Sequence, residues 1–297
     1  MTEPRNSRSP VYNFRGQTAV VTGAAQGIGR TVAERLAASG AFVVVADQQE
    51  KLAAAAAEHI CAGIGRAVAY EVDVTDEVAV GELIRFAATN SGRFSVLVNN
   101  AGISTTGLLD EVTLADWRRV IDVNLTGPFI TSKAALPYLR RAGGKIVNIS
   151  SVAGKRISAN MAASYTASKA GVLALTRHLA YESAPWRVNV NAVCPGPVEA
   201  PMMYREVPPD AIARMVAGVP RGRLSTPDDL ADAVLFLASP AADMITGVAL
   251  DVDGGALLGW IDIAEYLARH GIDAGSAQAS DPECAELAPV EERGHVL

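Results

Sequence analysis

The sequence predicts an α/β protein with one doubly wound, seven-stranded parallel sheet and helices on both of its faces. Seven short apolar runs rich in β-branched residues alternate with helical stretches, and no repeat or linker interrupts the alternation. Continuous apolar runs are typical of strands that are buried on both faces. Helices between such strands imply right-handed crossovers within a parallel sheet. The length would allow two small domains, but this pattern favours one, over residues 15–259.

Each predicted element has a local reason. The strands end at Gly, Asn, Asp, Ser or Pro, and the helices carry apolar residues at helical spacing between polar caps. The predicted strands are 18–22, 42–46, 67–72, 95–98, 145–149, 188–193 and 248–252. The predicted helices are 30–39, 51–60, 76–90, 113–122, 126–141, 165–181 and 227–239. Residues 200–223, which contain Pro and Met, are predicted to form a looser segment.

The two ends of the chain differ from the body. Residues 1–14 are polar, and we expect a flexible N-terminal arm. Residues 260–297 hold all of the net charge of −6, so the body is close to neutral. Asp262 and Glu265 have capping-box spacing, which predicts a short helix over 263–269, followed by disorder from 274. This helix and Trp260 either cover a neighbouring subunit or the substrate mouth, or form an inert appendage.

Composition narrows the class of protein. No apolar run approaches the roughly 20 residues that cross a bilayer, and the N-terminus lacks an apolar signal segment. We therefore expect a cytoplasmic protein with no membrane partner. The body has no basic stripe, which argues against nucleic acid. Cys61, Cys194 and Cys284 are widely spaced, so we expect neither disulfides nor a metal site.

A glycine-rich turn joins the first strand to the first helix. It reads Gly23-Ala-Ala-Gln26-Gly27-Ile28-Gly29. Glycines allow a tight turn and close approach to a pyrophosphate, and the helix N-terminus supplies free N–H groups. The context of strand, turn and helix therefore predicts a phosphate-binding loop.

Asp47 ends the second strand, 18 residues beyond Gly29. A carboxylate at about this distance accepts hydrogen bonds from the adenosine ribose hydroxyls. It would repel a 2′-phosphate, and Gln26 supplies no compensating cation, so the chemistry favours NAD over NADP. The alternative is an aspartate that only caps the next helix.

Tyr165 and Lys169 are four residues apart at the start of a predicted helix. This spacing puts both side chains on one face, one turn apart. An ammonium beside a phenol favours the phenolate, and we expect it to lower the pKa of Tyr165 from about 10 toward neutrality. Such a tyrosine can exchange a proton with an alcohol or carbonyl oxygen. Alternatively, the pair is only a solvated surface feature.

Polar residues also follow three later strands. Asn99-Asn100-Ala101-Gly102 follows the fourth strand, and Ser150-Ser151 the fifth. Ligands of open α/β sheets bind beyond these carboxyl edges. Asn124 stands where two predicted helices meet, and because Asn is unfavourable inside helices it marks a kink or contacts a polar group.

Taken together, these motifs resemble the short-chain dehydrogenase/reductase family over roughly residues 15–255. The resemblance rests on the order and spacing of the glycine turn, Asp73-Val74, Asn99–Gly102, Asn124, Ser151, Tyr165 with Lys169, and Pro195-Gly196. It implies a Rossmann-like fold, an NAD cofactor and reversible hydride transfer between a secondary alcohol and a ketone. The residues implied to bind the cofactor are Gly23, Gln26, Gly27, Ile28, Gly29, Asp47, Asp73, Val74, Asn100, Ala101, Gly102, Tyr165, Lys169, Pro195, Gly196 and Val198.

The resemblance also implies four catalytic residues. Tyr165 would be the acid/base, and Ser151 would position the substrate oxygen. Lys169 would bind the nicotinamide ribose, and Asn124 would hold a water that connects Lys169 to solvent. We choose Ser151 over Ser150 because a strand alternates its faces. Family members are commonly tetramers or dimers, so a homo-oligomer is expected.

Three departures from the family pattern stand out. The gap from Ser151 to Tyr165 is one residue longer than usual, Ala200 replaces a common threonine, and the chain continues past Gly255. The alternatives to an NAD-dependent dehydrogenase are an NADPH-dependent 3-oxoacyl-carrier reductase and a cofactor-binding regulator or scaffold without turnover.

Substrate-pocket walls are expected from 103–106, 152–161 and 200–215. Four apolar residues there, Met202, Met203, Tyr204 and Met215, favour a hydrophobic ketone or alcohol, unless they only pack against the body or a partner subunit. Lys155 and Arg156 either attract an acidic group or are simply solvated.

Overall fold

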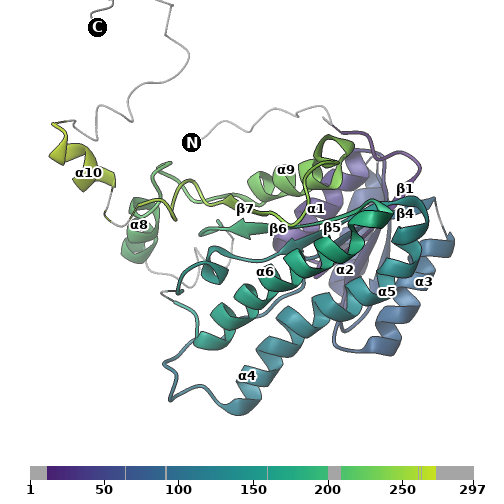
Figure 1. The fold of residues 1–297 in the computed structure, drawn as a ribbon, viewed down its shortest axis with the longest axis horizontal. Coiled ribbons are helices and arrows are strands. Elements are labelled where there is room, and N and C mark those ends of the chain that lie inside the picture. The colour runs from purple at the N-terminus through teal and green to yellow at the C-terminus, as the bar shows by residue number, and fades with distance from the viewer. Residues whose placement is uncertain are drawn as a thin grey trace, which may run out of the picture.

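The computed structural model describes residues 12–63, 65–90, 92–158, 160–199, 209–259, 261 and 263–271. It contains the predicted sheet, with seven strands in the order β3-β2-β1-β4-β5-β6-β7 and every neighbouring pair parallel (Figure 1). The strands are β1 (Gln17–Thr22), β2 (Phe42–Asp47), β3 (Arg66–Glu71), β4 (Arg93–Asn99), β5 (Gly144–Ile149), β6 (Val188–Pro195) and β7 (Ala249–Val252).

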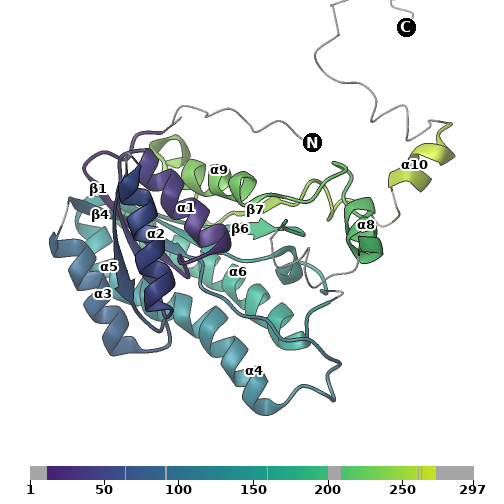
Figure 2. The same cartoon turned by 180° about the vertical axis from the view of Figure 1, so that it is seen from behind.

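Helices cover both faces of this sheet, as Figures 1 and 2 show from opposite sides. One face carries α1 (Gly27–Ala38), α2 (Glu50–Ala62) and α9 (Pro227–Ala238), and the other carries α3 (Glu77–Asn90), α5 (Gly127–Ala142) and α6 (Ala163–Ser183). The alternation of a strand explains the two layers: on β1, Ala19 and Val21 pack into the first core, whereas Val20 packs into the second. The predicted fold class is confirmed.

The strand order reverses at β1, which lies between β2 and β4. The loop after β1 and the loop after β4 run to opposite faces of the sheet. A crevice therefore opens between them, beyond the carboxyl edge of the sheet. The short helices that border this edge are α4 (Leu114–Ile121), the π-helix η1 (Asp122–Thr126) and the 3-10 helix η2 (Val152–Gly154).

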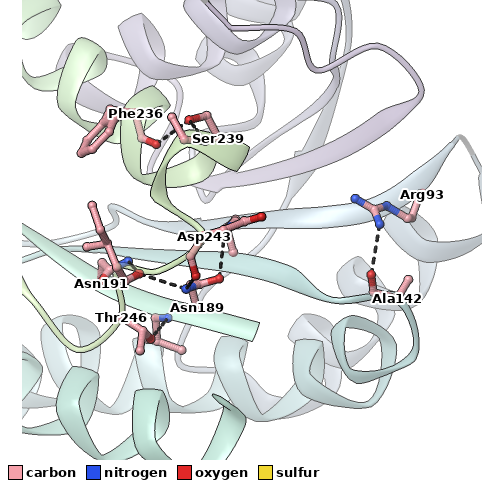
Figure 3. A network of polar contacts seen from close by, with 12 residues as sticks. Arg93, Ala142, Asn189, Asn191, Phe236, Ser239, Asp243 and Thr246 are labelled. Carbon is pink, nitrogen blue, oxygen red and sulfur yellow. Dashed lines mark hydrogen bonds and ion pairs between the residues drawn. The ribbon is translucent and has the colours of Figure 1, made fainter. Parts of the chain in front are cut away.

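At the amino edge of the sheet, polar side chains bond to backbone groups of neighbouring segments (Figure 3). Near the start of β6, Asn189 Nδ2 donates to the carbonyl oxygens of Asp243 (2.9 Å) and Ile245 (3.0 Å). Asn191 Nδ2 donates to Ile245 O at 2.9 Å, and its Oδ1 accepts from Val248 N at 3.2 Å. These two amides fasten the chain that precedes β7 to the neighbouring strand β6.

Most predicted elements lie within a few residues of the observed ones. The prediction of a loose segment over 200–223 is wrong in part, because Pro209–Ala217 forms α8 and its Met215 packs with Val219 and Leu224. Residues 200–208, which include Met202, Met203 and Tyr204, lie outside the described residues.

At the C-terminus, α10 (Ile263–Arg269) has the predicted bounds. Trp260, Asp262 and residues 1–11 and 272–297 lie outside the described residues, so the arm, the capping box and the predicted disorder stay predictions. Among the described helices, none combines the length and apolar character needed to cross a membrane.

Candidate active site

The glycine turn is held against the end of β4. Gly23 has φ +62°, and a Cβ there would lie 2.7 Å from Ala101 Cα. A Cβ on Gly29 would lie 2.4 Å from Gly23 O. Asn100 Nδ2 donates to Thr22 O and Gly23 O at 3.0 and 2.9 Å. At Gly27, with φ +58°, the side-chain direction opens into free space. The turn is therefore packed tightly on one side and open on the other.

A cavity of about 670 Å³ lies along this turn and crosses the ends of β1, β2, β3 and β4. Its lining is mostly polar and includes ten of the predicted residues or their neighbours: Gly23, Gln26, Asp47, Asp73, Val74, Thr75, Asn100, Ala101, Gly102 and Ile103. The structure therefore brings predicted residues that follow four different strands together around one cavity.

Asp47 sits at the floor of this cavity and is buried. Its Oδ2 accepts from Ala25 N at 3.1 Å and its Oδ1 accepts from Gln49 N at 3.0 Å. The carboxylate therefore supports the glycine turn and the turn that leads into α2, whose N-cap is Gln49, and it also lines the cavity, so it is more than a helix cap. Each carboxylate oxygen can accept more than one hydrogen bond, so capacity for ribose hydroxyls remains.

Asp73 and Val74 form the next wall. Asp73 Oδ1 accepts from Thr75 N and Thr75 Oγ1 at 2.9 and 2.8 Å, which fixes the turn after β3. Asp76 Oδ1 accepts from Val78 N and Ala79 N and so caps α3. Val74 is buried against Gly127.

The opposite wall is one face of α4 and η1, and the sequence reading missed it. The residues that line the cavity are Ala115, Arg118, Arg119, Asp122 and Val123. Their spacing of three and one residues is the repeat of a single helix face, and this signal could have found them. Gln48 and Gln49, directly after Asp47, were also missed.

Asn124 lies inside the π-helix η1 and is buried. Its Oδ1 accepts from Ile103 N at 2.8 Å, and its Nδ2 donates to Ile103 O at 2.8 Å and Ser168 Oγ at 3.1 Å. Both sequence readings of Asn124 hold, since it marks an irregular turn and contacts polar groups. It ties the loop after β4 to α6.

A second cavity, of about 290 Å³, lies beside the first and shares Asn100, Gly102 and Ile103 with it. Its remaining lining comes from α1, the ends of β5 and β6, and α6: Ile28, Ser104, Ile149, Ser150, Ser151, Met161, Tyr165, Lys169, Pro195, Gly196 and Val198. This cavity is therefore lined by all three of the predicted residues Ser151, Tyr165 and Lys169, which lie within 18 positions of one another in the sequence.

Tyr165 and Lys169 lie on the same face of α6, with Lys169 Nζ 5.7 Å from the Tyr165 ring centroid. Ser151 forms a side-chain hydrogen bond with Tyr165. Ser150 instead points to the backbone, where its Oγ donates to Lys169 O at 2.9 Å. The geometry supports the choice of Ser151 as the serine that faces the site.

The predicted lowering of the Tyr165 pKa is wrong. Burial raises the pKa of Tyr165, and the hydrogen bond from Ser151 offsets only part of that effect. Lys169 is itself desolvated, which lowers its pKa to about 8, and its Nζ donates to Ile149 O at 2.9 Å. The sequence argument considered the nearby charge alone, whereas removal from water is the larger effect on both groups.

Pro195, Gly196 and Val198 form the rim of the second cavity. A Cβ on Gly196 would lie 2.8 Å from Asp253 Cβ, so the chain here rests on the turn after β7. Val198 pairs with Ser225 in an isolated parallel bridge. Ala200 lies outside the described residues.

Lys155 and Arg156 do not line this cavity and lie at the exposed surface. Lys155 Nζ forms an ion pair with Asp251 Oδ1 at 2.6 Å and donates to Ala249 O at 3.0 Å. Arg156 Nη1 donates to Ala256 O at 3.0 Å. Both residues are exposed, which agrees with the expectation of a solvated pair, but each side chain also bonds to β7 or to the turn after it, which neither expectation included.

The residues present fit a dinucleotide. The glycine turn leaves open space where a phosphate needs close backbone approach, and carboxylate and amide groups line one end of the joined cavities. The other end holds a phenol, a hydroxyl and an ammonium around a small space. This fold and this arrangement define the class of nucleotide-dependent oxidoreductases.

Comparisons with known proteins define the family. A family model described as enoyl-(acyl carrier protein) reductase matches residues 23–256. Trans- and cis-4-hydroxycyclohexanecarboxylate dehydrogenases of Sinomonas cyclohexanicum are 42% and 45% identical, over 82% of this chain and 93% and 97% of their own length. A 3-oxoacyl-[acyl-carrier protein] reductase with bound NAD from Brucella melitensis has a TM-score of 0.77 at 36% identity, covering 86% of this chain and 97% of that one.

The chain belongs to the short-chain dehydrogenase/reductase family. It is an oxidoreductase that acts on CH–OH groups of a small-molecule substrate with a nicotinamide cofactor.

Proposed function

We propose that this protein transfers a hydride between NAD(H) and a secondary alcohol or ketone, with Tyr165 as the acid/base. One observation carries the proposal: Tyr165, Ser151 and Lys169 surround a small cavity that joins the polar cavity beside the glycine turn. When bound, the nicotinamide supplies or accepts the hydride. The protein then has to bind and orient the cofactor and the substrate, and exchange one proton with the substrate oxygen.

Each residue has a defined task in this proposal. Tyr165 donates its phenolic proton to the carbonyl oxygen during reduction and removes the hydroxyl proton during oxidation. Ser151, hydrogen-bonded to Tyr165, holds the same substrate oxygen. Lys169 holds the nicotinamide ribose, and Asn124 supports the water path from Lys169 to solvent.

The raised pKa of Tyr165 gives the two directions different pH dependence. Near neutral pH the group is a neutral phenol, which is the form that reduction needs. Oxidation needs the phenolate, so its rate should increase with pH through the alkaline range.

Cofactor binding is assigned to the residues along both cavities. Gly23, Gln26, Gly27, Ile28 and Gly29 would receive the pyrophosphate, and Asp47 the adenosine ribose. The others would contact the adenine, the groove or the carboxamide: Asp73, Val74, Asn100, Ala101, Gly102, Pro195, Gly196 and Val198.

NAD is preferred over NADP in this proposal because the buried carboxylate of Asp47 faces the cavity. A 2′-phosphate beside it would bring like charges together. Titration with NADH and NADPH, followed by nucleotide fluorescence, should give at least about tenfold tighter binding of NADH. Equal or reversed affinities would refute the role of Asp47. The matched variant Asp47→Ser should reduce the preference.

The substrate that fits best is a compact alicyclic secondary alcohol. Ile103, Ile149, Met161 and Val198 give the second cavity apolar walls. Two relatives that cover most of this chain are named for hydroxycyclohexanecarboxylates. A panel of cyclohexanol, cyclohexanone, cis- and trans-4-hydroxycyclohexanecarboxylate, and an acetoacetyl thioester should be followed by NADH absorbance. Turnover of the cyclic compounds is expected.

Reduction of 3-oxoacyl thioesters is the second candidate. It is favoured by the likeness to the Brucella melitensis reductase. This alternative is NADPH-dependent, so the panel is repeated with NADPH, and turnover of the thioester alone would establish it in place of the first. We also expect a homotetramer or dimer in the cytoplasm, with residues 15–259 as the catalytic domain, and light scattering will measure the subunit number.

A further inference from the structure

The loop that carries Ser151 is clamped from two sides. We call residues 150–158 the Ser151 loop. On one side it rests on α6: a Cβ on Gly154 would lie 2.8 Å from the Lys169 carbonyl carbon and oxygen, and Ser150 Oγ bonds to the same carbonyl. Ser151 Oγ also accepts from Ala153 N at 3.1 Å and so caps η2.

On the other side, the clamp is Lys155. Its ammonium reaches past β6 to β7, where it bonds to Asp251 Oδ1 and Ala249 O. The two side chains of the ion pair are only 28% and 35% exposed, so water screens the pair less than a fully exposed one. Arg156 adds one hydrogen bond to the turn after β7.

The clamp lies over a buried thiol. Cys194 on β6 stands opposite Asp251 in the strand register and has no exposed surface. Ser150 N donates to the carbonyl oxygen of Val193, the residue before Cys194, at 2.8 Å, and the charges of Lys155 and Asp251 both act on the thiol. The thiol therefore lies beneath the Ser151 loop, and access to it reports whether the loop is in place.

We propose that Lys155, through its ion pair with Asp251, is a positioning residue that holds the Ser151 loop against the catalytic helix α6. The atoms that Lys155 bonds to lie outside the loop, on β7. The consequence for turnover rests on the proposed function, whereas the fastening itself does not.

The molecule offers a matched control at the other edge of the sheet. Lys145, at the start of β5, pairs with Asp243 in the same way, and its side chain is 11% exposed. Removing either lysine costs one ion pair, but only Lys155 belongs to the Ser151 loop. Lys145→Met therefore measures the purely structural cost of such a change.

The test uses the full-length protein with Cys61→Ser and Cys284→Ser, so that Cys194 is the single thiol. Lys155→Met, Asp251→Asn, Lys155→Arg and Lys145→Met are compared in this background. The first readout is the rate at which an aromatic disulfide reagent labels Cys194. The second is kcat and KM for cyclohexanol with NAD, and NADH affinity by fluorescence shows that the cofactor site is intact.

Lys155→Met and Asp251→Asn should each raise the labelling rate about tenfold and lower kcat about tenfold, because small displacements of a catalytic group are costly. NADH affinity should stay within about twofold, and Lys155→Arg and Lys145→Met should behave like the parent. Equal labelling rates in Lys155→Met and Lys145→Met would overturn the inference. If the parent turns over no alcohol, the proposed function fails, and the labelling rates still decide the positioning role.

Discussion

At the amino edge of the sheet, asparagine side chains bond to backbone groups of the segment before β7, whereas at the carboxyl edge several polar side chains line open cavities. Asn189 is buried and donates to two carbonyl oxygens, and Asn191 both donates and accepts (Figure 3). At the carboxyl edge, Asp47, Tyr165 and Lys169 retain part of their bonding capacity toward the two cavities. The first edge serves stability and the second serves binding and chemistry, so changes at the two edges should have separable effects.

The largest effect should come from Tyr165→Phe at the carboxyl edge. The change removes one hydroxyl and with it the proton donor, so kcat should fall by about 10³-fold or more. NADH affinity, measured by fluorescence, should change by less than about threefold, because the phenol ring remains. Residual turnover within tenfold of the parent would contradict the role of Tyr165. Asn189 lines neither cavity, so Asn189→Ala should not reduce kcat in this way and serves as the control from the other edge.

Lys169→Met should change how stability depends on pH. Burial lowers the pKa of Lys169 from 10.5 to about 8, so the unfolded chain holds this proton more tightly than the folded one. Wherever the unfolded state binds more protons, stability rises with pH. Between pH 8 and 10 the parent should therefore gain up to about 3 kcal/mol relative to the variant, and it should gain nothing below pH 8.

The measurement is urea unfolding of the cofactor-free proteins at several pH values from 7 to 10. Tyr165 is present in both proteins, so its raised pKa contributes equally to their free energies of unfolding and cancels in the difference between them. Parallel stability curves would show that Lys169 does not titrate as its burial implies.

At the amino edge, Asn189→Ala should cost stability and leave catalysis intact. The side chain is buried, and its loss leaves the carbonyl oxygens of Asp243 and Ile245 and the ammonium of Lys145 without one partner each. The expected loss is about 2 kcal/mol in urea unfolding. Below the unfolding transition, kcat/KM should stay within about twofold of the parent. A large fall in kcat/KM would mean that the two edges are coupled.

The same contrast explains what the sequence could reveal. The carboxyl edge was predictable because its chemistry follows from adjacent residues: a glycine turn after one strand, an aspartate after the next, and Tyr165 one helical turn from Lys169. The Asn189 contacts join residues more than 50 positions apart, and no local pattern announces them. They depend on the path of the segment that connects the 3-10 helix η4 (Pro240–Ala242) to β7, which contains Asp243 and Ile245.

Two features of the site itself were also beyond local reasoning. The pKa of Tyr165 depends on burial, which is set by α6, β5 and β6 together, and the charge of Lys169 alone gave the wrong direction. Lys155 finds Asp251 on β7, 96 positions away. By contrast, the face of α4 that lines the first cavity was predictable, because Arg118, Arg119 and Asp122 have the spacing of one helix face.

The smallest effect should follow removal of residues 260–297, because both edges are complete before that point. Asp253 closes the last turn of the carboxyl edge, where its Oδ1 accepts from Gly255 N at 2.8 Å and its Oδ2 from Leu257 N at 2.9 Å. The described helix beyond it, α10, has no buried residue. The chain shortened after Gly259 should therefore unfold within about 0.5 kcal/mol of the parent. Its NADH affinity should also be unchanged, since no residue beyond Gly259 lines either cavity in the described part of the chain. A lower subunit number by light scattering, or an altered KM for cyclohexanol, would instead give the extension a role in assembly or at the substrate mouth.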